Sequence, residues 1–215
     1  MKLKEKRMMS YFIEATREII DEEGINKVTI RRIADKSGYN SATLYNYFKN
    51  LDVLLIYASI SYFKDYIEDL RRRVNKVKDP IERYVAIYEV FNDFSFKYPD
   101  IYFNMFYGIY NDMLSDIIKE YYLIFPEELE EVDEDLSTML TSGDMYKRDQ
   151  AITKEFKCLG FSQEDVDFII ETTIRVHTSY LHQVVINKNI DKKAHSESFI
   201  VYLKELIKRV GDNNE

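Results

Sequence analysis

The chain has 215 residues, of which 46% are hydrophobic and 32% are charged, and a formal net charge of −8 at pH 7. This composition is typical of a soluble globular protein and excludes a disordered one. With only six glycines and three prolines, an irregular or all-β architecture is not expected, and the sequence predicts an all-α fold. Residues 1–52 carry ten Lys/Arg and eight Asp/Glu, whereas residues 53–215 carry 20 and 30. Overall acidity therefore does not exclude DNA binding by the N-terminal part, because affinity depends on local neutralisation of phosphates.

The sequence favours a cytoplasmic protein without a membrane partner. Cys158 is the single cysteine and cannot form an internal disulfide, which suits a reducing compartment. The N-terminus MKLKEKRMMSYF is basic but lacks the sustained apolar run of a signal peptide. No segment approaches the ~20 apolar residues that a membrane-spanning helix needs.

A first helix is expected over about residues 5–23. The segment Thr29–Phe48, TIRRIADKSGYNSATLYNYF, then predicts two short helices around a tight turn. Thr29 can cap the first of them, since its hydroxyl accepts a hydrogen bond from a free helical N–H. Gly38 ends that helix, because glycine adopts the left-handed conformation at little steric cost.

The second short helix begins after a cap at Asn40 or Ser41, and its inward side chains are Leu44, Tyr47 and Phe48. Its first turn carries small residues that let the backbone approach a DNA groove. The pattern predicts a helix-turn-helix.

The rest of the chain is expected to be helical almost throughout. A long helix is predicted from about residue 52 to 76, and Asp79-Pro80 opens another that ends near Tyr98, before Pro99.

Further along the chain, seven carboxylates among residues 127–135 are expected to form an exposed stretch, because like charges repel. Helices are predicted over about 145–158, 163–187 and 196–210, and the apolar residues of the last two recur at helical spacing.

The middle of the chain is rich in aromatic residues, with 14 of the 31 Tyr and Phe residues between positions 84 and 125. Such a stripe is most often core. Eight of the 14 are tyrosines, however, whose hydroxyls need partners when buried, and polar residues are interspersed. Apolar walls with a few polar groups are typical of a small-molecule site, so an effector cavity is the alternative. The side chains expected to line it are Tyr88, Phe91, Asp93, Phe103, Phe106, Tyr107 and Tyr110.

The N-terminal quarter resembles the TetR family of bacterial transcriptional regulators. The resemblance rests on the helix-turn-helix and on the helix before it, through Ile13, Ala15, Ile19, Ile20, Gly24, Val28, Thr29, Ile33, Ala34, Gly38, Thr43, Leu44, Tyr45, Tyr47, Phe48, Lys49, Leu54 and Leu55. It implies a three-helix DNA-binding domain over residues 1–51, followed by a larger helical effector-binding and dimerisation domain over residues 52–215.

The resemblance also implies which residues contact DNA. Bases would face Ser41, Ala42 and Thr43, and the duplex would also be contacted by Thr29, Arg31, Tyr45, Tyr47 and Lys49. Tyr45 and Tyr47 have an alternative role as packing residues. Three positions depart from the family pattern: Leu51 and Ser41 stand where basic residues are common, and Tyr39 replaces a smaller aliphatic residue.

In this family the last two helices pair with their copies, and two linked heads read a palindromic operator in double-stranded DNA. The expected homodimer interface is formed by Val166, Ile170, Thr173, His177, Leu181, Val184, Phe199, Leu203, Leu206 and Val210. The alternative is that these residues are ordinary core. The implied function is a repressor that a small aromatic or lipophilic effector releases from DNA.

Two other functions are alternatives to a repressor. An enzyme is not expected, because the three histidines form no metal or catalytic motif and no phosphate-binding glycine loop or C-x-x-C pair occurs. No metal and no cofactor are predicted. The second alternative is a helix-turn-helix protein that has become a protein-interaction module with weak or no DNA binding, which the uncharged Ser41 and Leu51 allow.

Overall fold

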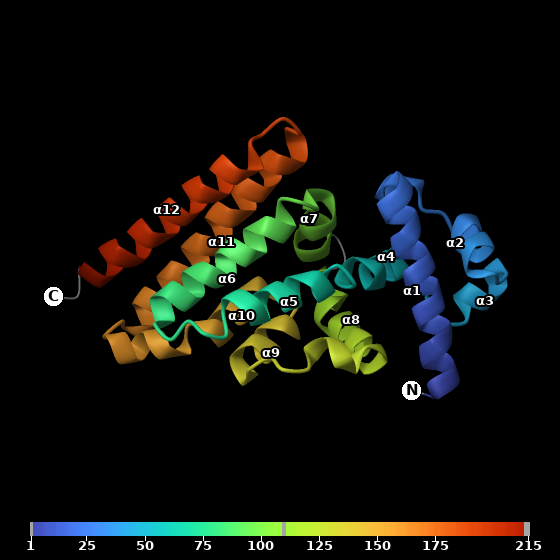
Figure 1. Ribbon diagram of the computed structural model, residues 1–215, viewed down its shortest axis with the longest axis horizontal. Helices are drawn as coiled ribbons and strands as arrows, with labels where there is room; N and C mark the ends of the chain where they lie inside the picture. The colour runs from blue at the N-terminus through green and yellow to red at the C-terminus, as the bar shows by residue number, and fades with distance from the viewer. Residues whose placement is uncertain (1, 109–110, 213–215) are drawn as a thin grey trace.

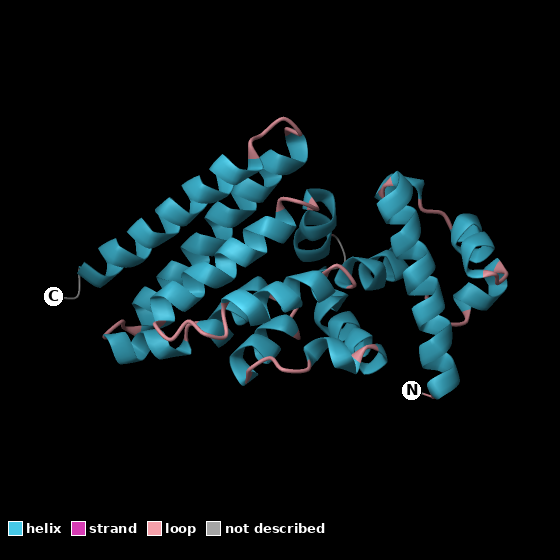
Figure 2. Cartoon of the chain, viewed as in Figure 1, coloured by secondary structure: helices cyan, strands magenta, loops and turns pink. Residues whose placement is uncertain are grey.

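The computed structural model describes residues 2–108 and 111–212, and every regular element in that part of the chain is a helix (Figures 1 and 2). The N-terminal head comprises α1 (Leu3–Glu23), η1 (Ile25–Lys27), α2 (Ile30–Ser37) and α3 (Ser41–Tyr45). The body comprises α4 (Leu51–Ile60), α5 (Phe63–Arg73), α6 (Pro80–Ser95), α7 (Pro99–Tyr107), α8 (Asn111–Ile124), η2 (Pro126–Leu129), α9 (Glu134–Leu140), α10 (Met145–Ile152), η3 (Lys154–Leu159), α11 (Gln163–Ile186) and α12 (Lys192–Asp212). The expected all-α fold is confirmed.

The head is built around α1, which packs against α2, η1 and α4. Phe12 of α1, Ile33 of α2, Leu44 of α3 and Phe48 just beyond α3 are almost fully buried. These side chains come from the helical stripes of the sequence, and their burial holds α2 and α3 at the outer side of α1 (Figure 1).

The long helix expected over residues 52–76 is interrupted between α4 and α5, so that prediction was wrong. Ser59 and Ser61 donate their hydroxyls to the carbonyls of Leu55 and Ala58, at 2.7 and 2.6 Å. Side-chain bonds of this kind compete with and bend a helix. The chain re-enters a helix at Phe63, which has no exposed surface.

The body is organised around α6, α11 and α12, which lie side by side (Figure 1). Asp79 caps α6 through the N–H of Glu82 at 2.8 Å, and Ser162 begins α11 with a reciprocal capping box. The helix expected over 145–158 ends instead at Ile152, where the buried hydroxyl of Thr153 donates to the Asp149 carbonyl at 2.9 Å.

The inward stripes of α11 and α12 are core of this chain, which corrects the residues predicted for the dimer interface. A side chain without exposed surface cannot contact a second copy while the chain keeps this fold. Nine of the ten predicted residues are buried: Val166, Ile170, Thr173, His177, Leu181, Val184, Phe199, Leu203 and Val210, with Leu206 half-buried. Helical spacing identified the inward side correctly, but it faces α6 and α7 of the same chain.

The acidic stretch 127–135 is mostly exposed, as expected, with Glu128 and Asp135 half-buried. Glu128 is partly buried, its carboxylate accepts the Tyr121 hydroxyl at 3.2 Å, and its carbonyl accepts from Arg71 at 2.9 Å. Burial raises the pKa of Glu128 to about 7. Asp133 caps α9 and pairs with Arg83 at 2.6 Å. Native partners thus offset the mutual repulsion of this run. Within the described residues, no helix is long and apolar enough to cross a membrane.

Candidate nucleic-acid interface and interior polar centre

The helix-turn-helix is formed by α2, the turn at Gly38 and α3. Gly38 has φ +76°, a left-handed conformation that favours glycine. Thr29 caps α2 through the N–H of Arg32 at 3.3 Å. Of the two candidate caps for α3, the structure uses Asn40, whose Oδ1 accepts from the N–H of Thr43 at 2.8 Å and from its hydroxyl at 3.1 Å. These two hydrogen bonds from Thr43 to Asn40 fix the first turn of α3.

All eight residues predicted to contact DNA are solvent-accessible. Thr29, Arg31, Ala42, Tyr45 and Lys49 are exposed, and Ser41, Thr43 and Tyr47 are half-buried. Tyr45 is 56% exposed, whereas Tyr47 packs against the core with its ring centroid 6.2 Å from that of Phe12. Tyr47 therefore has the packing role that was its alternative, whereas the Tyr45 side chain points away from the core.

Two basic side chains of the head are bound to carboxylates of α1. Lys36 contacts Glu22 at 2.8 Å and Glu18 at 3.2 Å, and Arg32 pairs with Glu23. Other cations are better placed for phosphate. The Arg31 side chain is 91% exposed with Asp35 only at the 4.0 Å limit, and Lys49 takes part in no ion pair among the described residues.

The departures from the family pattern have structural roles. Leu51 opens α4 and packs half-buried on the core, after the Asn50 side chain caps that helix through the N–H of Val53 at 2.9 Å. Tyr39 stacks on Tyr11, with ring centroids 6.3 Å apart. Leu51 and Tyr39 therefore stabilise the head.

A polar joint connects the head to the body beside the break between α4 and α5. Arg17 of α1 donates to the Ser61 carbonyl at 3.1 Å and lies over the Tyr62 ring at 4.9 Å. The Tyr62 hydroxyl donates to Asp21 of α1, and the Tyr57 hydroxyl donates to Glu120 of α8. These contacts join α1 to the segment that begins α5, and α4 to α8.

The interior of the body holds a polar centre that the sequence did not reveal. Asp149 of α10 is 3% exposed and accepts the hydroxyls of Tyr84 and Tyr88 at 2.8 and 2.6 Å. Arg148 is 2% exposed, donates to the carbonyls of Met139 and Ser142, and lies 5.0 Å from the centroid of the Phe106 ring. Arg148 and Asp149 are adjacent and lie in no recognisable motif, so no signal in the sequence indicated their burial.

A cavity of about 10 Å³ adjoins this centre, which is room for about one water molecule. Its lining includes Tyr88 and Phe91 from the predicted effector set, together with Met139, Met145 and Asp149.

The other predicted effector residues are dispersed. Phe106 is buried beneath Arg148, and together with Tyr107 it lines a separate groove of about 460 Å³ between α7, α10 and α11. Phe103 contacts His182 instead, with ring centroids 5.5 Å apart. The prediction that Asp93 lines an interior cavity was wrong, because Asp93 is exposed and paired with Arg73 outside the interior. The predicted Tyr110 lies outside the described residues.

The buried carboxyl of Asp149 makes stability depend on pH. Burial raises the pKa of Asp149 to about 6, although the hydroxyls of Tyr88 and Tyr84 and the charge of Arg148 lower it. The folded state thus holds this proton more tightly than the unfolded chain. The contribution of Asp149 to the free energy of unfolding is present below the unfolded pKa and is lost as pH rises through about 6.

We expect the Asp149→Asn variant not to show this decrease in the free energy of unfolding as pH rises. Between pH 4 and 7, the free energy of unfolding of the unmodified chain should fall by about 2–3 kcal/mol more than that of the variant. Urea denaturation at a series of pH values measures the difference, and parallel curves would contradict it.

In the described part of the chain, no three His, Cys, Asp or Glu side chains come together as a metal site. The two features described above are an exposed α3, the second helix of the helix-turn-helix, and a helical body with a polar interior.

Comparison with known proteins agrees with this geometry. Residues 12–58 match the family described as bacterial regulatory proteins, tetR family. No curated protein matches the chain.

Solved structures share the fold over most of the chain. RolR in complex with resorcinol has a TM-score of 0.63 and 15% identity, covering 97% of this chain and 93% of its own. FadR of Thermus thermophilus in complex with lauroyl-CoA has a TM-score of 0.61 and 15% identity, and the match covers 93% of this chain and 94% of FadR. FadR of Bacillus subtilis in complex with stearoyl-CoA has a TM-score of 0.56 and 17% identity, and the match covers 90% of this chain and 96% of that FadR. At such identities the likeness shows the fold alone. Residues 12–58 thus match the DNA-binding domain of the tetR family of bacterial regulatory proteins, and the chain as a whole shares the fold of these solved structures.

Proposed function

We propose that the protein is a sequence-specific transcriptional repressor that binds a palindromic operator as a homodimer. The observation that carries this proposal is the accessible first turn of α3, which Asn40 holds rigidly through two bonds to Thr43. In this proposal Ser41, Ala42 and Thr43, all accessible, contact base edges, while the exposed Arg31 and Lys49 supply charge for phosphates. The residue assignments follow from exposure together with the family resemblance.

The dimer would use the outer faces of α11 and α12, because their inner faces are occupied by core. On α11, Phe168 is 56% exposed and Ile186 is 68% exposed. An interface along α11 with a second copy would remove both of these apolar side chains from water.

We place the effector site at the interior polar centre. Aromatic walls and the Asp149 carboxylate suit a small aromatic molecule with a hydroxyl or N–H donor. The bound resorcinol of RolR belongs to this chemical class. The present cavity is too small for such a molecule. Met145 lines both this cavity and the outer groove between α7, α10 and α11. The unbranched Met145 side chain can move more readily than a branched one, and would open a path between the two.

Release from DNA follows from linkage. An effector weakens DNA binding only if it binds better to a form whose heads are wrongly spaced for the operator. Opening the interior would shift α8 or α5, and the polar joint at Arg17 and Tyr57 would transmit that shift to the head.

A binding selection tests the function. Purified protein, shown by sedimentation to be dimeric, is presented with randomised duplex DNA at moderate salt, and retained duplexes are sequenced. We expect enrichment of a palindrome with two separated half-sites. Phenols and other aromatics are then screened for release of the protein from that site. Absence of enrichment from folded dimer would remove the proposal and favour the protein-interaction module.

A further inference from the structure

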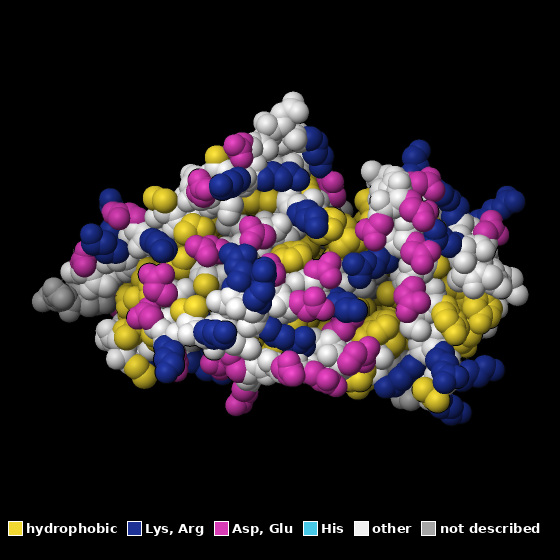
Figure 3. All heavy atoms as spheres, viewed as in Figure 1, with side chains coloured by type: hydrophobic (Ala, Val, Ile, Leu, Met, Phe, Trp, Pro, Cys, Tyr) yellow, Lys and Arg dark blue, Asp and Glu magenta, His cyan; other side chains and the backbone are white. Residues whose placement is uncertain are grey.

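A groove of about 690 Å³ lies between α6 and α12, with Arg73 of α5 at its edge. This volume is within the range of sites for small organic molecules, roughly 300–1,000 Å³. None of its lining residues lines the interior cavity. In the space-filling view, basic side chains lie along the junction of α12 and α6 with apolar atoms exposed between them (Figure 3).

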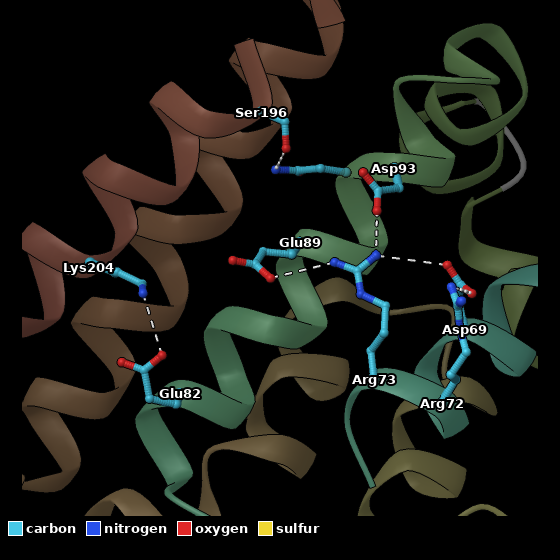
Figure 4. A network of polar contacts seen from close by, with 9 residues as sticks. Asp69, Arg72, Arg73, Glu82, Glu89, Asp93, Ser196 and Lys204 are labelled. Atoms are coloured by element: carbon cyan, nitrogen blue, oxygen red, sulfur yellow. Dashed lines mark hydrogen bonds and ion pairs between the residues drawn. The ribbon is translucent and has the colours of Figure 1, made fainter. Parts of the chain in front are cut away.

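The groove is basic although the body of the chain is acidic. Its lining contains five Lys/Arg and three Asp/Glu, whereas residues 53–215 contain 20 Lys/Arg and 30 Asp/Glu. Two of the three lining carboxylates, Glu89 and Asp93, are already paired with Arg73 (Figure 4). The lysines of the lining are therefore less neutralised than their surroundings.

These lysines differ in how they are paired. Lys204 contacts Glu82 at 3.4 Å (Figure 4), and Lys193 lies at the 4.0 Å limit from Glu197. Within residues 2–108 and 112–212, Lys97 and Lys192 form no ion pair within 4.0 Å. Uncompensated positive charge in a concave site attracts anions.

The floor of the groove adds apolar surface above one unsatisfied polar group. Val201 is 68% exposed, and Ile200 and Phe96 line the same groove. Asn92 has no exposed surface and donates to the Ser196 hydroxyl at 3.0 Å, while its Oδ1 has no partner. Because the Asn92 side chain has no exposed surface, it belongs to the packing beneath the groove, and the apolar side chains above it are the accessible part of the floor.

We propose that this groove binds an anionic amphiphile. Its carboxylate or phosphate contacts Lys97, Lys192 and Lys193, and its apolar body lies on Ile200 and Val201. The site is separate from the interior effector site and does not depend on DNA binding.

Isothermal titration of the full chain with N-dodecanoylglycine, kept below its micelle concentration, tests the proposal. This probe has a carboxylate, an amide N–H and an alkyl chain. The neutral N-dodecanoylglycine amide keeps the last two only. We expect the acid to bind more tightly than the amide, with an affinity that decreases as salt rises.

Replacing Lys97, Lys192 and Lys193 together by Gln should weaken binding of the acid by about tenfold, and binding of the amide much less. Val201→Glu, at an exposed position, should weaken both probes. Lys208→Gln on α12 lies outside the groove and serves as the matched control. No binding of the acid, equal binding of the amide, or an unchanged affinity in the triple variant would overturn the proposal. A lower sedimentation mass for Val201→Glu without probe binding would assign the groove to a second copy and also overturn it.

Discussion

Arg148→Met is expected to lower the free energy of unfolding at pH 7 by about 3 kcal/mol, because the buried guanidinium lies over the Phe106 ring and also favours the charged form of Asp149, and both interactions are lost. The change also removes the donors to the carbonyls of Met139 and Ser142. Methionine fills much of the same volume, so the effect reports the lost charge and hydrogen bonds more than a cavity. Urea denaturation measures it.

Two further variants separate these contributions. Lys147→Met changes an exposed neighbour on the same helix and should alter stability by less than about 0.5 kcal/mol. Adding Asp149→Asn to Arg148→Met should recover part of the loss, because a neutral amide still accepts from Tyr84 and Tyr88 but needs no countercharge. A loss below about 1 kcal/mol for Arg148→Met would show that the charge is not important to the fold.

Thr43→Ala is expected to reduce discrimination between the selected palindrome and a scrambled duplex by about a hundredfold. One lost base contact typically changes discrimination by about 1–3 kcal/mol, and a dimer loses one in each half-site. The variant also loses the hydroxyl bond to Asn40, although the backbone bond of the same cap remains. Fluorescence anisotropy with both duplexes measures the ratio.

Thr43→Ser keeps the hydroxyl and its bond to Asn40, and should retain most of the discrimination. Lys49→Ala should weaken binding to both duplexes alike and make the dependence of affinity on salt shallower, because a phosphate contact is lost. Equal losses on both duplexes from Thr43→Ala and Lys49→Ala would contradict the separate roles of base and phosphate contacts.

The head could be predicted almost completely because its information is local. Gly38 is required by a left-handed turn, a polar residue is required before α3, and Leu44 and Phe48 recur at helical spacing. Local rules left open only the choice between Asn40 and Ser41 as cap, and the distribution of roles between Tyr45 and Tyr47.

The body was predicted as helices but not as a site. Periodicity showed which side of α11 and α12 is apolar, but it cannot show whether that side meets the same chain or a copy. That is why the predicted interface residues proved to be core. The Asp93 assignment failed for a related reason, since α6 has both a buried and an exposed face and spacing to the aromatics did not separate them.

The sequence by itself determined the helical class, the position of the helix-turn-helix and the caps that start its helices. These depend on interactions within a few residues. Only the tertiary structure decided that Arg148 and Asp149 lie in the interior, that α4 and α5 are separate helices, and that Lys97, just after α6, shares a groove with lysines of α12. Each of these depends on which distant segments pack together, and in particular on Tyr84 and Tyr88, which lie more than 60 residues before Asp149 in the chain.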